Sequence, residues 1–191
     1  MNYKVPFVDF PEQYNRLYSE LNAAVSEVFE GGDLVMRRQL AEYEDSLAQF
    51  VGVRHAVGTN SGTDALTLSL SAAGIGPGDE VITVAHTFVA TLAAIVHNGA
   101  TPILIDIGSD FNMDVSLLDD AVSPRTKAIV PVHLNGRLCD MDTIMAFAEK
   151  NNLVVIEDAA QALGARYNKM LAGSFGLTGC FSFYPAKILG G

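Results

Sequence analysis

The chain has 191 residues, a size that predicts one domain or slightly more. It carries 22 acidic side chains against 12 Lys and Arg, a formal net charge of −10, so a nucleic-acid-binding surface of clustered basic residues is not expected. Hydrophobic residues make up 49% and charged residues 18% of the sequence, which allows a sizeable core and argues against global disorder.

Two kinds of segment alternate along the chain. Apolar positions three or four residues apart predict two N-terminal helices, over 12–29 and 38–50. From residue 53 onward, apolar strands are expected at 55–58, 80–84, 103–106, 128–132, 153–157 and 179–183. Amphipathic helices are expected between them, at 64–73, 88–98, 116–122 and 142–151. This order predicts an α/β fold with a mainly parallel (mixed) sheet and helices on both faces.

The segment between Glu80 and Asp106 contains no acidic or basic residue, and its length alone would suit a membrane-spanning helix. His97, Gly99 and Pro102 interrupt it, and its pattern changes along its length. We therefore expect a strand, a helix, a turn and a strand here, and no membrane partner.

Cysteine and histidine spacing indicates no metal site. Cys139 and Cys180 form neither a CxxC motif nor a Cys/His ligand set, and the four histidines have no ligand spacing. The first ten residues lack the charged start and apolar run of a signal peptide. We expect two reduced, buried thiols and a cytoplasmic protein.

Ligands bind beyond the carboxyl ends of the strands in sheets of this kind. After the first expected strand, Ser61 and Asp64 have capping-box spacing, and Gly62 and Thr63 between them open a helix. Gly62 lets a ligand approach the backbone closely, and the free N–H groups of a helix start suit a phosphate. A well-capped helix with nothing bound is the alternative.

Three further candidates follow other strands. Phe88 offers a flat ring, Asp158 a carboxylate at a strand end, and Lys187 an amine just past an apolar strand. Asp158 could instead cap a helix, and Lys187 could be an ordinary surface lysine. Pyridoxal 5′-phosphate (PLP) needs a phosphate anchor, a ring to stack on, an anion for its pyridine nitrogen and an amine for its aldehyde. Together these residues predict a PLP site.

Six segments, in this order and at this spacing, give the chain a family resemblance. They are GTNSGTDAL (58–66), GDEVITVAHTFVAT (78–91), ATPILIDI (100–107), PRTKAIVPVHLNG (124–136), VVIEDAAQALGA (154–165) and GCFSFYPAK (179–187). The sequence resembles the DegT-type nucleotide-sugar aminotransferases within fold type I of the PLP enzymes. The resemblance implies an N-terminal arm with helices over 1–52 and the N-terminal part of the PLP-binding large domain over 53–191.

The resemblance also assigns the cofactor contacts. Gly62 and Thr63 would bind the cofactor phosphate, with Ser182 adding a side-chain donor. Phe88 would stack on the pyridine ring.

The resemblance assigns the other contacts with the cofactor to three further residues. Asp158 would pair with the ring nitrogen, Gln161 would contact the ring hydroxyl, and Lys187 would form the Schiff base and later shuttle protons. The family resemblance also implies a ping-pong transfer of an amino group from an amino acid, typically glutamate, to a nucleotide-linked keto-sugar. It implies a homodimer with shared active sites as well.

Two rival functions stay open. Sugar dehydratases of the same fold tend to replace the lysine with histidine, so Lys187 favours transamination. A non-catalytic regulator or inactive fragment is the other, because family members are considerably longer than 191 residues. The resemblance predicts that their next strand inserts between 55–58 and the strand ending at Phe183, and that a small C-terminal domain follows.

Overall fold

The computed structural model describes residues 4–32 and 34–190, and the expected domain limits at residues 1 and 191 fall outside these ranges. The α-helices are α1 (Phe10–Gly31), α2 (Arg38–Val51), α3 (Gly62–Ala72), α4 (Val89–His97), α5 (Leu118–Ala121) and α6 (Met141–Asn151). The strands are β1 (Glu80–Val84), β2 (Thr101–Ile105), β3 (Thr126–Ile129), β4 (Val154–Asp158), β5 (Arg166–Tyr167), β6 (Met170–Leu171) and β7 (Thr178–Cys180). Two short 3₁₀ helices are η1 (Val115–Leu117) and η2 (Leu134–Gly136).

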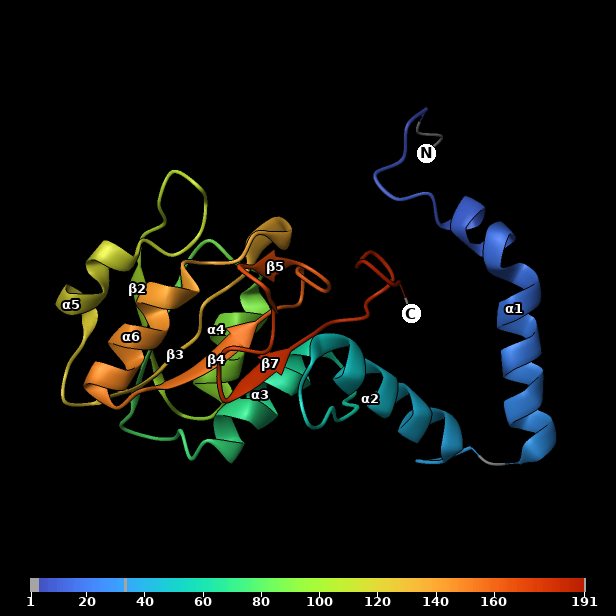
Figure 1. Ribbon diagram of the computed structural model, residues 1–191, viewed down its shortest axis with the longest axis horizontal. Helices are drawn as coiled ribbons and strands as arrows, with labels where there is room; N and C mark the ends of the chain where they lie inside the picture. The colour runs from blue at the N-terminus through green and yellow to red at the C-terminus, as the bar shows by residue number, and fades with distance from the viewer. Residues whose placement is uncertain (1–3, 33, 191) are drawn as a thin grey trace.

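Five strands form one sheet in the order β2-β1-β3-β4-β7, and each neighbouring pair is parallel. β5 and β6 form a separate antiparallel hairpin, which the sequence did not lead us to expect. The α/β prediction with a mainly parallel sheet is confirmed (Figure 1). The carboxyl ends of the five strands therefore lie at one edge, where the expected site residues follow.

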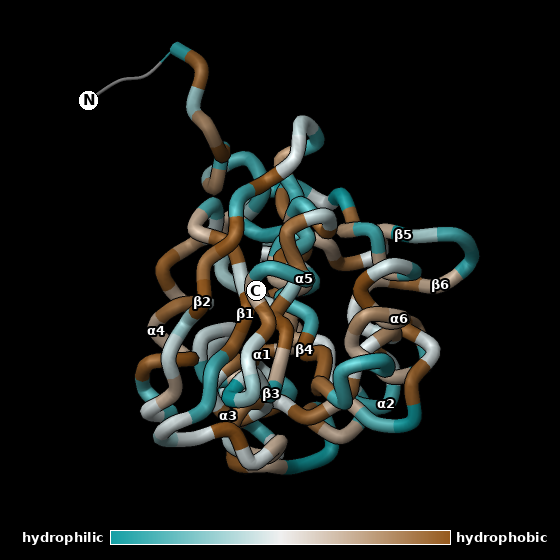
Figure 2. The backbone as a smooth tube through the Cα atoms, turned by 90° about the vertical axis from the view of Figure 1, so that its left-hand side faces the viewer, coloured by the Kyte–Doolittle hydropathy of each residue, from teal (hydrophilic) through white to brown (hydrophobic). Residues whose placement is uncertain are grey.

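Helices cover both faces because successive strand residues point to opposite sides. On β4, Val155 belongs to the core that includes α5 and α6, whereas Ile156 belongs to the core that includes α3 and α4. Figure 2 shows apolar stretches running through the central strands, with α4 and α6 on opposite sides of them. The same alternation directs Glu157 toward the α6 side and Asp158 toward the α3–α4 side.

The two N-terminal helices contribute little to these cores. α1 has no buried residue and stands apart from the sheet in Figure 1. α2 leads back toward the sheet and buries only Ala48 and Val51. Gly52, in the left-handed region at φ 83°, ends α2.

The prediction of a strand at 55–58 is wrong, because the structure has no strand at these residues. No strand neighbour pairs with these residues in the part of the chain that the structure describes. Val57 is 79% exposed, and the Gly58 N–H donates to the side chain of Glu44 instead of to a sheet partner. An apolar run becomes a strand only when a neighbour supplies its ladder hydrogen bonds.

The segment 80–106, uncharged between Glu80 and Asp106, folds as β1, α4 and β2, as predicted. Among the described residues, no helix has both the length and the apolar composition needed to cross a membrane.

Candidate functional site

The start of α3 and the coil after β7 meet at the carboxyl edge of the sheet. The Ser61 hydroxyl accepts a hydrogen bond from the Asp64 N–H at 3.1 Å, which caps α3 as predicted. A Cβ atom at Gly62 would lie 2.9 Å from the Ser182 Cβ and 3.2 Å from the Phe181 carbonyl oxygen. Only glycine fits this contact without displacing its neighbours. Gly62 and Ser182, predicted from distant parts of the sequence, are therefore adjacent.

Two other expected residues lie on the same two segments of the chain. Thr63 is the second residue of α3 and is half-buried. Lys187 is also half-buried, and its backbone N–H donates to the Tyr184 carbonyl oxygen at 2.7 Å, so a turn presents it just past β7.

Asp158 ends β4 and is only 6% exposed. Its Oδ2 accepts a hydrogen bond from the Thr91 hydroxyl at 2.7 Å, and its Oδ1 accepts one from the Ala160 N–H at 3.2 Å. Burial raises the pKa of Asp158 above its ordinary value, although the hydrogen bond from Thr91 and the positive charge of Lys187 lower it in part. The structure thus buries the Asp158 carboxyl group and gives each of its oxygens one hydrogen-bond donor.

Phe88 is the N-cap residue of α4, and its ring is largely exposed at 66%. Its backbone carbonyl accepts from the Thr91 N–H at 3.2 Å, so the same helical turn presents Phe88 to solvent and Thr91 to Asp158. Gln161 lies beyond β4, where its Oε1 accepts from the Asn135 N–H at 3.0 Å. Contacts between Phe88, Gln161 and a ligand stay predictions.

A buried pair beneath Asp158 was missed by the sequence analysis. His133 and Glu157 are both fully buried, with 3.0 Å between His133 Nε2 and Glu157 Oε2. The same carboxylate accepts the N–H groups of Gly173, Phe175 and Gly176 at 2.7–2.9 Å. Burial raises the pKa of Glu157, but the hydrogen bonds from His133 and from this backbone outweigh it and lower the pKa overall. Glu157 thereby ties the loop before β7 to the centre of the sheet.

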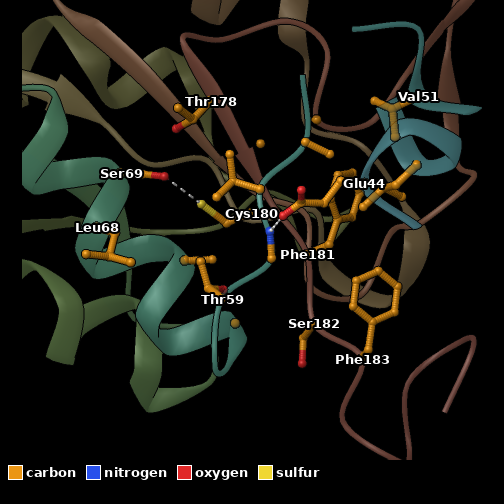
Figure 3. A pocket seen from close by; sticks show the side chains of 18 of the residues that line it. Glu44, Val51, Thr59, Leu68, Ser69, Thr178, Cys180, Phe181, Ser182 and Phe183 are labelled. Carbon is orange, nitrogen blue, oxygen red and sulfur yellow. Dashed lines mark hydrogen bonds between the residues drawn. The ribbon is translucent and has the colours of Figure 1, made fainter. Parts of the chain in front are cut away.

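A groove of about 850 Å³ borders the Gly62–Ser182 contact, and both residues line it. In Figure 3, Leu68 and Ser69 of α3 lie on one side and Glu44 on another, and the Ser69 hydroxyl meets the Cys180 thiol at 3.3 Å. Neither Asp158 nor Phe88 lines this groove.

The residues at the strand ends suit PLP by their chemistry. The Gly62–Ser182 contact leaves no room for a Cβ beside the free N–H groups of α3, which is the close backbone approach that a phosphate needs. A buried carboxylate suits a protonated ring nitrogen, and Lys187 supplies the amine. No cluster of His, Cys, Asp or Glu able to hold a metal occurs within 4–32 and 34–190.

Comparison with known proteins agrees with this chemistry. A "pleiotropic regulatory protein" of Geobacillus stearothermophilus is 43% identical over 97% of this chain and 50% of the relative. The UDP-N-acetyl-3-dehydro-alpha-D-glucosamine 3-aminotransferase of Acidithiobacillus ferrooxidans is 45% identical over 99% of this chain and 52% of the relative. The crystal structure of Streptomyces venezuelae DesV in complex with a ketimine intermediate superimposes with a TM-score of 0.95 at 42% identity, covering 99% of this chain and 51% of that one.

The chain thus spans about half the length of the curated relatives it matches. Residues 15–190 match the DegT/DnrJ/EryC1/StrS aminotransferase family, and the chain belongs to that family.

Proposed function

We propose that the protein containing this chain is a PLP-dependent aminotransferase that moves an amino group from an amino acid, glutamate by preference, to a nucleotide-linked keto-sugar. One observation supports this most directly: the Asp158 carboxyl group at the end of β4 is only 6% exposed and accepts hydrogen bonds from Thr91 and Ala160. Burying an anion is costly unless a cation or a set of donors compensates it. A site with such a carboxylate at the end of β4 and the amine of Lys187 on the coil after β7 suits a cofactor with a cationic ring and an aldehyde.

The chain's own residues would hold the cofactor at four points. The first N–H groups of α3, at Gly62 and Thr63, and the Ser182 hydroxyl would bind the phosphate. The Phe88 ring would cover one face of the pyridine. Asp158 would hold the proton on the ring nitrogen, and Gln161 would donate to the ring hydroxyl.

Bound PLP supplies an electron sink that stabilises negative charge on the carbon of the amino acid next to nitrogen. Lys187 would bind the cofactor aldehyde in the resting protein. Once the amino acid displaces it, the free Lys187 amine would accept the proton from the substrate carbon and return it to the cofactor carbon, which is general base and general acid catalysis by one group. When the keto-sugar reacts, Lys187 would move the proton in the opposite direction, from the cofactor carbon to the substrate carbon.

We infer a homodimer in the cytoplasm, with residues 1–52 acting as an arm and 53–191 as the PLP-binding part. Support comes from α1, whose apolar side chains Leu17, Leu21, Val25 and Phe29 are 38–69% exposed. Such a stripe suits a second subunit. Light scattering on the intact protein tests the dimer, and an active monomer would contradict it.

A regulatory role is the second candidate, because the Geobacillus relative carries a regulatory name. A dehydratase is disfavoured by Lys187. The test supplies the intact protein with PLP, glutamate and a panel of UDP-, dTDP- and GDP-linked keto-sugars, and measures 2-oxoglutarate. Formation of 2-oxoglutarate with wild type and its loss in Lys187→Ala support the proposal. PLP binding without turnover on any sugar would favour the regulator, and loss of water without glutamate consumption would favour the dehydratase.

A further inference from the structure

Thr91 makes a contact that neither helix formation nor core packing requires. It is 1% exposed on α4, and its hydroxyl donates to Asp158 Oδ2 at 2.7 Å. A threonine in a helix more often bonds its own helix, as Thr67 does with the Thr63 carbonyl at 2.9 Å. Thr91 instead links α4 to the end of β4.

The geometry fixes the direction of a two-step hydrogen-bond chain. Thr87, in the loop between β1 and α4, lies 2.8 Å from Thr91, oxygen to oxygen. A hydroxyl has a single proton, and Thr91 gives its proton to the carboxylate, which can only accept when ionised. Thr87 must therefore donate to Thr91. Both hydroxyl dipoles then point toward Asp158, and hydrogen bonds to a charged acceptor are the stronger kind.

Apart from Thr91, the structure gives the Asp158 carboxylate few groups that stabilise its charge. The Ala160 N–H at Oδ1 is the second donor that the structure gives it, at 3.2 Å. Three ionisable groups interact electrostatically with Asp158. They are His133 on the segment after β3, Lys187 on the segment after β7, and Cys180 on β7 itself. Glu157 precedes it on the opposite side of the strand and is occupied by His133 and the Gly173–Gly176 backbone.

We propose that Thr91, supported by Thr87, is a positioning residue: it holds the Asp158 carboxylate ionised and oriented so that its remaining acceptor positions face the cofactor ring nitrogen. This rests on the proposed function for the ring contact, but the effect on Asp158 itself does not. Phe88, the proposed stacking residue, lies between Thr87 and Thr91 in sequence, so one turn would set both the ring face and the carboxylate.

The test compares Thr91→Val, which removes the hydroxyl and keeps the shape, with Thr91→Ser, which keeps the hydroxyl. Thr83→Val is the matched control. Thr83 is also fully buried and donates at 2.9 Å, but to the Val130 carbonyl and not to Asp158. Thermal melts of all variants monitor folding.

Two readouts on the intact protein separate positioning from packing. The first is the pH titration of the Asp158 carboxyl carbon by ¹³C NMR without cofactor, with the resonance assigned by its loss in Asp158→Asn. The second is the dissociation constant for PLP. In Thr91→Val the titration midpoint should move to higher pH, and PLP should bind about tenfold more weakly, the equivalent of one charge-assisted hydrogen bond. Thr91→Ser should restore both, and Thr83→Val should change neither.

Each other outcome decides against the inference. An unchanged Asp158 titration in Thr91→Val, an equal change in Thr83→Val, or no recovery in Thr91→Ser would make Thr91 a packing residue. If Thr91→Val does not fold, the test passes to Thr87→Val, at the half-buried end of the hydrogen-bond chain. This variant must move the Asp158 titration midpoint to higher pH by a smaller amount, or the inference fails. If wild type does not bind PLP, the proposed function fails, and the titration still decides the role of Thr91.

Discussion

Replacing Glu157 with glutamine should destabilise the protein strongly, although the two side chains have nearly the same size and shape. Oε1 accepts the N–H groups of Phe175 and Gly176, and Oε2 accepts Gly173 and His133. A glutamine amide keeps one oxygen, so two of the four donors would face an NH₂ group.

His133 cannot relieve this by changing tautomer. Its Nδ1 accepts the Cys139 N–H at 3.3 Å, so a proton on Nδ1 would oppose that donor. Each buried donor left without an acceptor costs about 1–3 kcal/mol, so Glu157→Gln should lose about 2–6 kcal/mol. That is a large part of the ~5–15 kcal/mol that stabilises a typical domain.

The stability lost in Glu157→Gln should be largest at neutral pH and should shrink at acid pH. Because the pKa of Glu157 is lowered in the folded protein, its contribution is complete above the pKa of an unfolded glutamate, about 4.3, and is lost as pH falls through the folded value. Urea unfolding should therefore show the largest gap between wild type and Glu157→Gln at pH 7 and a narrowing gap below about pH 4.

The matched control is Glu42→Gln, whose exposed carboxylate pairs with Arg38 and should contribute little. Equal urea midpoints for wild type and Glu157→Gln at pH 7, or a gap that stays constant down to pH 3, would refute the reasoning.

Three further predictions follow from the same contacts. Asp158→Asn should retain most PLP binding but reduce turnover roughly a hundredfold or more, the equivalent of ~3 kcal/mol; near-normal turnover would exclude its role. Gly62→Ala places a Cβ 2.9 Å from the Ser182 Cβ, so a PLP titration should show roughly tenfold weaker binding, and unchanged affinity would show that the contact is not part of the phosphate site. Burial raises the pKa of Cys139 to about 12 and of Cys180 to about 11, so both thiols should react with a disulfide reagent at pH 8 only on unfolding; rapid labelling of the native protein would contradict this.

Periodicity predicted most of the helices and strands because local pattern controls them. α4 was expected at 88–98 and occurs at Val89–His97, and β1 was placed correctly at 80–84. The strand at 55–58 failed because pairing depends on a neighbour that no local pattern encodes. The hairpin β5–β6 was missed since its strands are only two residues long.

The candidate site was predictable where residue type reveals chemistry. Gly62 next to Ser182, and Asp158 at the end of β4, match the expectation of a shared edge. The supporting residues could not be read in the same way, because Thr91 looks like an ordinary helix residue. Glu157 did leave a signal: an acidic residue ending the apolar run from Val154 to Ile156 must find partners when buried.

Lys187 is the residue on which the proposed transamination depends most, and one experiment tests directly whether it binds PLP. The intact protein is incubated with PLP, reduced with borohydride, digested and examined by mass spectrometry, with Lys187→Ala as the control. We predict a pyridoxyl group on the peptide that contains Lys187 and none in the control. Label on Lys127, Lys150 or Lys169 while Lys187 stays unmodified would contradict the account.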